Sequence, residues 1–339
     1  MSKERNTMKR HFEKYAGKRI LITGGAGCIG SNLTRTLLKT NVEKIMVLDD
    51  LSSAERWNVP NDPKVTFVQG SILDDEVLKS VFSEKPSYVF HLAALFANQN
   101  SIDHAETDLM VNGLGILKVL QYSHLAEVEK FVFSSSGCSV YGSQAPLPLR
   151  EDFVSLHLDT PYQITKLLGE LYCNFFHNYH GLPVAIGRLF NVYGPGEIPG
   201  KYRNVTPNFI YWALHDQPLP VMGTGEETRD FTFVEDAVDG LLLAGVIPEA
   251  VGEAINIASE TETKIIDLAN TINELTGNKK GVKFVERRKW DKIVRRRASI
   301  AKARKMLGYE PKTARKQAIK KTVDWFLKNR DKIEVSARF

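Results

Sequence analysis

The sequence predicts an α/β protein with a doubly wound, mainly parallel β-sheet, followed by a smaller C-terminal lobe. Two observations predict this class. Short apolar runs typical of buried strands alternate with segments of helical periodicity up to about residue 190, a pattern typical of parallel sheets with helices on both faces. Beyond that point, Gly/Pro-rich stretches such as "NVYGPGEIPGKYRN" and shorter elements replace the alternation, which indicates a separate lobe.

Six runs have the composition of buried strands, because they are rich in Val, Ile, Leu and Phe. These runs are residues 19–25, 44–50, 65–70, 88–94, 130–136 and 183–189. Residues 31–40 have helical periodicity directly after the first run. Because the carboxyl ends of such strands open onto one crevice, we expect a ligand to bind there.

A last amphipathic helix is predicted near the C-terminus, starting at the cap Thr313 and running through "ARKQAIKKTVDWFLK". The residues expected on its buried side are Ile319, Val323, Phe326 and Leu327.

The composition is that of an ordinary globular protein, with 43% hydrophobic and 25% charged residues in 339. Cys28, Cys138 and Cys173 show no metal-ligand spacing and are too few for a disulfide framework, so we expect no metal and a reducing, cytoplasmic setting. No apolar run is long enough to span a membrane, and the charged N-terminus lacks the apolar core of a signal peptide.

The net charge of +5 is unevenly distributed, because residues 279–330 hold 20 of the 45 Lys and Arg but only four acids. Such a region can attract nucleic acid or neutralise a phosphorylated small molecule. A solvated basic helix face with a few functional arginines is the simpler interpretation, and we expect no nucleic-acid partner.

The segment "TGGAGCIG" (23–30) follows the first strand and opens a helix. Gly24, Gly27 and Gly30 allow a tight turn that presents free N–H groups and the helix dipole to a pyrophosphate. Asp49 ends the next strand about twenty residues later, where a carboxylate can bind the adenosine ribose hydroxyls and repel a 2'-phosphate. The pattern therefore predicts a dinucleotide site that prefers NAD over NADP.

The segments "SSSGCSVYG" (134–142) and "PYQITK" (161–166) supply a candidate acid/base. A phenol titrates near pH 10, so Tyr162 alone is a poor base at neutral pH. Lys166 lies one helical turn away, and its ammonium, together with a positive nicotinamide ring, is expected to lower the pKa of that phenol. Ser136, at the carboxyl end of its strand, can share a hydrogen bond with a substrate hydroxyl.

These motifs resemble those of the extended short-chain dehydrogenases/reductases of the NAD-dependent epimerase/dehydratase family. The resemblance runs from about Lys18 to Val323 and also includes "VLDDLSS", "HLAA", "VNGLG", "RLFNVYGP", "GTGEETRDFTFVED" and "ASIAKARKMLGYEP". It implies a Rossmann-like domain over 18–190 that carries the catalytic residues. It also implies a mainly substrate-binding lobe over 191–330, with some segments free to return to the sheet. Residues 1–17 are then an N-terminal extension and 331–339 a tail.

The resemblance also implies roles for individual residues. Ser136, Tyr162 and Lys166 are the implied catalytic trio. The implied cofactor-binding residues are Gly24, Gly27, Ile29, Gly30, Asp49, Asp50, Ser71, Ile72, Leu92, Ala93, Ala94, Asn112, Tyr162 and Lys166. The implied substrate-binding residues are Ser136, Asn191, Asn204, Arg229 and Arg288, which would hold the diphosphate of a nucleotide sugar. A homodimer packed through two helices of the sheet domain, one of them carrying Tyr162, is also implied.

The residues after Ser136 bear on the reaction. Family members that dehydrate sugars carry an Asp-Glu pair there and sugar decarboxylases a Glu, whereas this chain has "GCS". Oxidation and re-reduction at C4 needs only Tyr162 and NAD, so we expect a nucleotide-sugar 4-epimerase acting on a UDP-hexose of the glucose/galactose type. Open alternatives are a nucleotide-sugar 4-dehydrogenase, a UDP-uronic acid 4-epimerase, a 4,6-dehydratase, a decarboxylase and a non-catalytic NAD-binding sensor.

Two departures from the family pattern concern the substrate. Phe96 follows "HLAAL" where some 4-epimerases have a polar side chain. The triplet Arg295, Arg296 and Arg297 lies just before the position where the family usually has an acid and this chain has Ser299. A solvent-facing triplet is one interpretation of these arginines; contact of one of them with an acidic sugar is the other.

Overall fold

The computed structural model describes residues 11–339 and is built on a seven-stranded sheet. The strand order is β3-β2-β1-β4-β5-β6-β9, and every neighbouring pair is parallel. This is the order of a doubly wound dinucleotide-binding sheet, extended by one strand. The predicted fold class is confirmed.

The sheet takes its seventh strand from beyond residue 190. Its strands are β1 (Arg19–Thr23), β2 (Lys44–Asp49), β3 (Val65–Gln69), β4 (Tyr88–His91), β5 (Lys130–Ser136), β6 (Val184–Leu189) and β9 (Ala254–Ile257). Two small ladders lie outside it: β7 (Leu219–Met222) with β11 (Val282–Val285), parallel, and β8 (Thr228–Asp230) with β10 (Glu262–Lys264), antiparallel.

Helices cover both faces of the sheet and build the second lobe. They are α2 (Cys28–Leu37), α3 (Asp75–Ser83), α4 (Asn98–Asp103), α5 (Ala105–Asp108), α6 (Gly115–Leu125), α7 (Pro161–His180), α8 (Val205–Leu214), α9 (Val234–Val246), α10 (Ile265–Thr276), α11 (Ala301–Leu307), α12 (Arg315–Lys328) and α13 (Arg330–Ser336).

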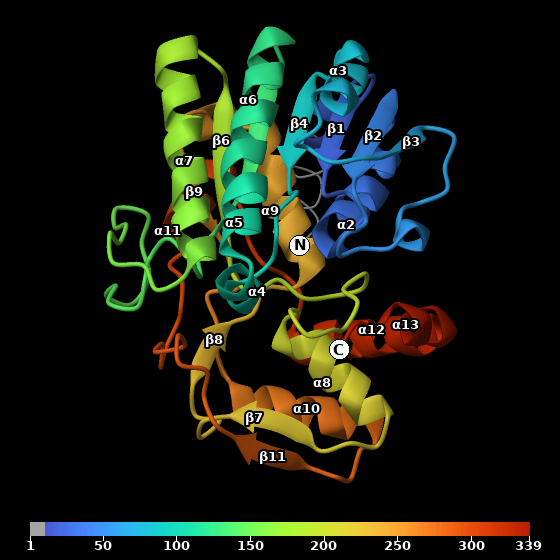
Figure 1. Ribbon diagram of the computed structural model, residues 1–339, viewed down its shortest axis with the longest axis vertical. Helices are drawn as coiled ribbons and strands as arrows, with labels where there is room; N and C mark the ends of the chain where they lie inside the picture. The colour runs from blue at the N-terminus through green and yellow to red at the C-terminus, as the bar shows by residue number, and fades with distance from the viewer. Residues whose placement is uncertain (1–10) are drawn as a thin grey trace.

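Alternate residues of each strand point to opposite faces of the sheet. Ile20 and Ile22 of β1 belong to the apolar core on one face, whereas Leu21 between them belongs to the core on the other. Helices α2 and α9 pack together on the first face, and α3, α6 and α7 pack side by side on the second. The carboxyl ends of the strands face the second lobe, which contains α8, α10, β7 and β11 and lies below the sheet in Figure 1.

Both described chain ends pack against the rest of the fold, and one residue predicted to be buried on α12 is exposed. The expected extension 1–17 lies partly outside the described residues, but Tyr15 within it is fully buried and donates a hydrogen bond to the Leu242 carbonyl oxygen at 2.8 Å. The expected tail over residues 331–339 contains most of α13, and its Phe339 ring packs on Trp212. Leu327, expected on the buried side of α12, is exposed. Ile319, Val323 and Phe326 form the buried face of this helix, and Leu327 lies outside that face.

A buried polar network ties α7 to the sheet. Glu170 of α7 accepts two hydrogen bonds from the Arg188 guanidinium of β6, at 3.0 and 2.8 Å, and one from the Ser135 hydroxyl of β5. Arg188 also donates to the Tyr141 hydroxyl at 3.0 Å. Both charged groups are almost fully buried, at 3% and 5% exposure. This network holds the helix that carries Tyr162 in register with the strand that carries Ser136.

Removal of the carboxylate from this network is expected to destabilise the protein strongly. Glu170→Gln leaves the Arg188 charge buried without a counter-charge, and we expect the free energy of unfolding to fall by about 3–5 kcal/mol. Urea titration followed by circular dichroism measures this. Glu76→Gln is the matched control, because Glu76 pairs with Lys79 on the exposed surface of α3; its effect should stay within about 0.5 kcal/mol. Equal effects of the two substitutions would contradict the structural role of Glu170.

Candidate active site

The glycine-rich segment forms a close turn between β1 and α2. Gly24 adopts a positive φ of 69°, and a Cβ there would lie 2.6 Å from the Ala93 backbone nitrogen. A Cβ on Gly30 would lie 2.5 Å from the Gly25 Cα. Only glycine fits at both positions, so no side chain covers the backbone where α2 begins. This arrangement fits a dinucleotide pyrophosphate at the helix N-terminus.

The carboxylate of Asp49, at the end of β2, is fixed beside this turn. One of its oxygens accepts a hydrogen bond from the Ala26 amide and the other from the Leu51 amide, each at 2.9 Å. Burial is the main influence on this group and raises the pKa of Asp49. The neighbouring Asp50 accepts from the Ser52 amide at 2.9 Å. These backbone hydrogen bonds fix the orientation of the Asp49 carboxylate in the cleft wall. Its oxygens can still accept further hydrogen bonds from a ligand.

The predicted catalytic trio comes together at the carboxyl end of β5. The Lys166 ammonium donates to the carbonyl oxygen of Ser134 at 2.9 Å, which joins α7 to the strand. The Tyr162 amide donates to the Ser101 hydroxyl at 3.0 Å. The Ser139 hydroxyl donates to the Ser136 hydroxyl oxygen at 2.9 Å, which leaves the Ser136 proton available to a substrate oxygen.

Burial within the protein opposes ionisation of the Tyr162 phenol. Burial raises the pKa of the Tyr162 phenol above its usual value, and the charges of Asp108 and Cys138 raise it further. Burial also lowers the pKa of Lys166 to about 8. Desolvation thus shifts each of the two groups toward its neutral form.

The other predicted substrate residues line the same cleft as the trio. Asn191 donates to the Asp230 carbonyl oxygen at 2.9 Å, and Asn204 donates to a carboxylate oxygen of Glu197 at 2.9 Å. The Nη2 nitrogen of Arg229 donates to both carboxylate oxygens of Asp291, at 2.9 and 3.0 Å. Arg229 thus pairs with a carboxylate distant in the sequence rather than with that of its neighbour Asp230.

Arg288 differs from Arg229 in its partners. Its guanidinium lies 5.9 Å from the centre of the Trp290 ring. Within residues 11–339, no carboxylate lies within ion-pair distance of Arg288. Burial lowers its pKa, as expected for a cation without a close counter-charge.

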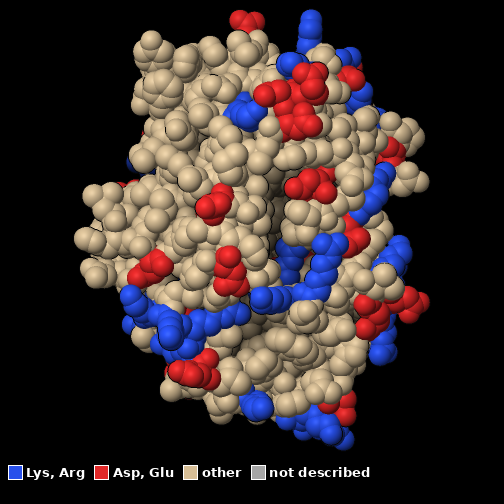
Figure 2. Space-filling model, viewed as in Figure 1, with Lys and Arg blue, Asp and Glu red and all other residues tan. Residues whose placement is uncertain are grey.

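One cleft of about 560 Å³ brings these groups together. It is lined by the predicted residues Gly24, Gly27, Ile29, Gly30, Asp49, Asp50, Ser71, Ile72, Leu92, Ala93, Ala94, Ser136, Tyr162, Lys166, Asn191, Asn204, Arg229 and Arg288. Figure 2 shows a hollow on this face, with Lys and Arg side chains gathered along its lower side, toward the second lobe.

Asn112 is the predicted site residue that does not line the cleft. It lies one layer behind, in the π-helical segment Leu109–Leu114, where its side-chain oxygen accepts from the Leu95 amide at 2.8 Å. Its side-chain nitrogen donates to the Asp108 carboxylate at 2.7 Å. Asn112 therefore holds the loop after β4 through the Leu95 backbone.

Several charged residues line the cleft wall that were not predicted as site residues from the sequence. Asp291, the partner of Arg229, and Arg203, beside the glycine-rich turn, both line it. Of the arginine triplet, Arg296 lines the cleft, whereas Arg295 pairs with Glu262 on the surface at 2.7 Å. Isolated charged residues in loops carry no periodicity, so the sequence offers no signal that separates them from solvated ones.

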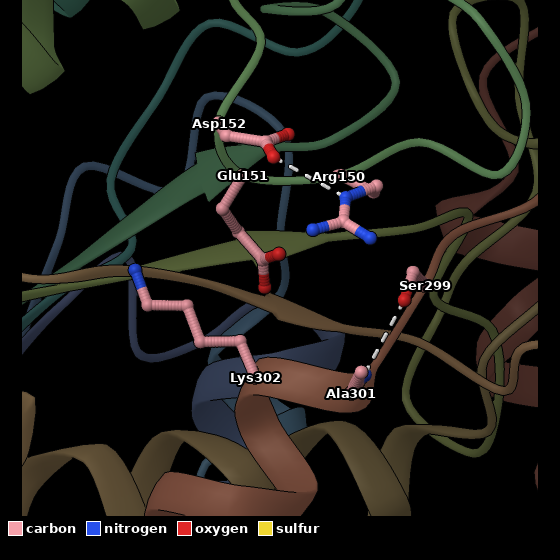
Figure 3. Close-up of a pocket in the computed structure, with 6 residues that line it drawn as sticks. All are labelled: Arg150, Glu151, Asp152, Ser299, Ala301 and Lys302. Atoms are coloured by element: carbon pink, nitrogen blue, oxygen red, sulfur yellow. Dashed lines mark hydrogen bonds and ion pairs between the residues drawn. The ribbon is translucent and has the colours of Figure 1, made fainter.

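A second, smaller cavity of about 270 Å³ lies apart from these residues (Figure 3). Arg150 pairs with Asp152 across its rim at 3.3 Å. Lys302, from α11, pairs with Glu253 at 2.7 Å. Its charges are thus largely matched by protein partners, and none of the predicted site residues lines it.

Residues 11–339 meet the requirements of neither a metal centre nor a membrane-spanning helix. No cluster of three or more His, Cys, Asp or Glu side chains there could hold a metal ion. No helix in the same residues has the length and apolar character needed to cross a membrane.

Comparison with known proteins supports the same family. Residues 20–258 match the family model described as "NAD dependent epimerase/dehydratase family". The chain is 34% identical over 311 residues to the UDP-glucose 4-epimerase of Mycolicibacterium smegmatis, covering 91% of this chain and 98% of that protein. It is also 33% identical over 319 residues to the UDP-N-acetyl-alpha-D-glucosaminuronate decarboxylase of Bacillus cytotoxicus, covering 91% and 98%.

Two solved structures resemble it closely. An epimerase of the methanogen Methanothermobacter thermautotrophicus superposes with a TM-score of 0.97 at 56% identity, covering 98% of this chain and 99% of that one. The Bordetella bronchiseptica enzyme WbmF in complex with NAD+ superposes with a TM-score of 0.83 at 40% identity, covering 95% and 96%. With a family model that matches most of its length and relatives that span nearly all of it, this chain belongs to the NAD-dependent epimerase/dehydratase family.

Proposed function

We propose that this protein is a nucleotide-sugar 4-epimerase that interconverts UDP-hexoses of the glucose/galactose type and retains NAD between turnovers. The observation that carries the proposal is the position of Tyr162, Lys166 and Ser136 in one cleft with the glycine-rich turn and two arginines. The similarity to a UDP-glucose 4-epimerase over 91% of the chain supports it.

The residues of the cleft fit NAD. Its nicotinamide ring supplies a hydride acceptor and donor. Gly24 and Gly30 leave the backbone bare for the pyrophosphate, and Asp49 offers acceptor oxygens to the ribose. A carboxylate at that place repels the extra phosphate of NADP, which favours NAD.

In the proposed reaction, Tyr162 takes the proton of the C4 hydroxyl while the hydride leaves C4. The 4-keto sugar then turns over in the cleft, the hydride returns to its other face, and Tyr162 gives the proton back. Ser136 donates a hydrogen bond to the reacting oxygen, and Lys166, held by Ser134, favours the phenolate. Atoms and electrons balance, because the sugar leaves with the hydride and proton that it brought.

The loop after Ser136 favours epimerisation over elimination or decarboxylation. Residues 137–139 read Gly-Cys-Ser and carry no acid. Asp108 is the acid that acts electrostatically on Tyr162, but both its oxygens are engaged, by Asn112 and by Thr165, each at 2.7 Å. A proton transfer at C5 or C6 therefore lacks a donor from this part of the chain.

Turnover of nucleotide sugars tests the proposal. Incubation with UDP-glucose or UDP-galactose, with products separated by chromatography, should give the C4 epimer without added NAD. Tyr162→Phe should lower kcat by at least about 100-fold, because general acid/base catalysis contributes about that much. Tyr172→Phe is the matched control, because Tyr172 lies on the same helix but packs against the core; its activity should stay within about twofold of the wild type.

Other outcomes would identify the other classes. A requirement for added NAD+ with build-up of NADH indicates a 4-dehydrogenase, a UDP-pentose with carbon dioxide indicates a decarboxylase, and a 4-keto-6-deoxy sugar indicates a dehydratase. Bound NAD without turnover of any nucleotide sugar indicates a sensor. Comparable activity in Tyr162→Phe and the wild type would contradict the catalytic assignment.

We further propose that the protein is a homodimer that packs through α7. Large apolar side chains on this helix are exposed at a spacing that places them on one face: Ile164, Leu171 and Phe175. Leu109 and Met110 are exposed in the adjoining π-helical segment. A contiguous exposed apolar face of this kind is typical of a protein interface.

Charge on this face should disrupt the dimer. The double substitution Leu171→Glu and Phe175→Glu is expected to convert a dimer into a monomer, because it would place four carboxylates at the interface. Size-exclusion chromatography with light scattering gives the mass. Leu327→Glu is the control, because Leu327 is an exposed apolar residue on α12. A wild-type mass equal to one chain would contradict the proposal.

A further inference from the structure

Arg296 is a buried arginine in the wall of the cleft. Its side chain is only 2% exposed. The guanidinium donates to the carbonyl oxygens of Gly137 and Gly142, each at 3.0 Å. These bonds use two of the five N–H groups of an arginine, so further donors remain for a ligand.

The two carbonyl partners do not neutralise the charge of Arg296. Within the described part of the chain, no carboxylate lies within ion-pair distance of it. Asp291 is the acid that acts on it from a distance, but that carboxylate is already paired with Arg229 and Arg287. Burial lowers the pKa of Arg296, and the Arg229 charge lowers it further.

Arg188 provides an internal comparison. It is about as deeply buried as Arg296, at 3% exposure, but forms a bidentate pair with Glu170. That carboxylate raises the pKa of Arg188 despite its burial. A buried charge without a counter-charge destabilises the folded protein. Glu170 neutralises the charge of Arg188, whereas the charge of Arg296 could be neutralised by an anionic ligand.

The neighbours of Arg296 place it beside the sugar. Gly137, which it binds, directly follows Ser136 of the catalytic trio. Arg229, a predicted diphosphate ligand, lines the same cleft and lies close enough for its charge to lower the pKa of Arg296. The sugar of a bound nucleotide sugar connects these two points, because its C4 must reach Tyr162 and its C1 carries the diphosphate. A hexose bound in this way would lie beside Arg296.

We propose that Arg296 binds a carboxylate carried by the hexose, so that the preferred substrate is a nucleotide-linked acidic sugar rather than a neutral one. The proposal rests on the proposed epimerase function and narrows its substrate class. A guanidinium fork matches a carboxylate with two parallel hydrogen bonds. Arg295, which pairs with Glu262 on the surface, has no such role.

The wild-type enzyme tests the substrate class without any substitution. UDP-glucuronate carries the carboxylate at C6, UDP-N-acetylmuramate carries it on an ether at C3, and UDP-glucose and UDP-N-acetylglucosamine are the neutral partners of each. We expect kcat/KM for one acidic substrate to exceed that of its neutral partner by at least about tenfold, with the C4 epimer as product. The acidic substrate that is preferred identifies the position of the carboxylate.

Substitution then tests the residue. Arg296→Gln should lower the ratio of acidic to neutral kcat/KM by about 10- to 100-fold, as expected for loss of a charge-assisted hydrogen bond. Arg296→Lys should restore part of this ratio, because it keeps the charge without the fork. Arg295→Gln is the matched control and should leave the ratio within about twofold. The NAD content per chain, measured after purification, checks that each variant is folded.

The outcomes separate this proposal from the epimerase function. Epimerisation of neutral UDP-hexoses in preference to both acidic ones overturns the acidic-sugar proposal and leaves the epimerase function standing. Failure to turn over any of the four overturns the epimerase function. A preference for an acidic sugar that Arg296→Gln does not change, in a variant with full NAD content, overturns the role of Arg296 and makes it a positioning residue of the loop 137–142.

Discussion

The hydrogen bond from the Lys166 ammonium to the carbonyl oxygen of Ser134 is the contact on which the site depends. At 2.9 Å, it fixes the rotation of α7 against β5. Because Tyr162 precedes Lys166 by four residues on the same helical face, that rotation brings the phenol toward Ser136, the last residue of the strand. The buried pair of Glu170 with Arg188 holds the next turn of the helix in the same register.

The same burial that positions the trio works against its charges. Desolvation raises the pKa of Tyr162 and lowers that of Lys166 to about 8. The protein alone thus favours a neutral phenol and makes the Lys166 ammonium easier to deprotonate. A positive nicotinamide ring beside the phenol would act in the opposite direction. The acidity of Tyr162 would thus depend on the oxidised form of the cofactor, which couples proton transfer to the redox state.

Much of this organisation could be predicted from the sequence, because it rests on local patterns. Alternating strand and helix periodicity predicted the sheet, and the glycine spacing and the Tyr162/Lys166 spacing predicted two parts of the cleft. The partners of charged side chains could not be predicted: Arg229 pairs with Asp291, 62 residues away, rather than with its neighbour Asp230. The partners of Asn112 could not be predicted for a related reason, since only the tertiary fold shows that its side-chain oxygen accepts from the Leu95 amide.

Return of the same hydride to C4 is the central claim, and isotope transfer tests it most directly. UDP-glucose and UDP-glucuronate labelled with deuterium at C4 should each be incubated with the enzyme, and the product examined by NMR spectroscopy. The account predicts that deuterium is retained at C4 of the epimer formed and that no solvent hydrogen enters that position. Loss of deuterium from C4 in a product that is nevertheless the C4 epimer would contradict it.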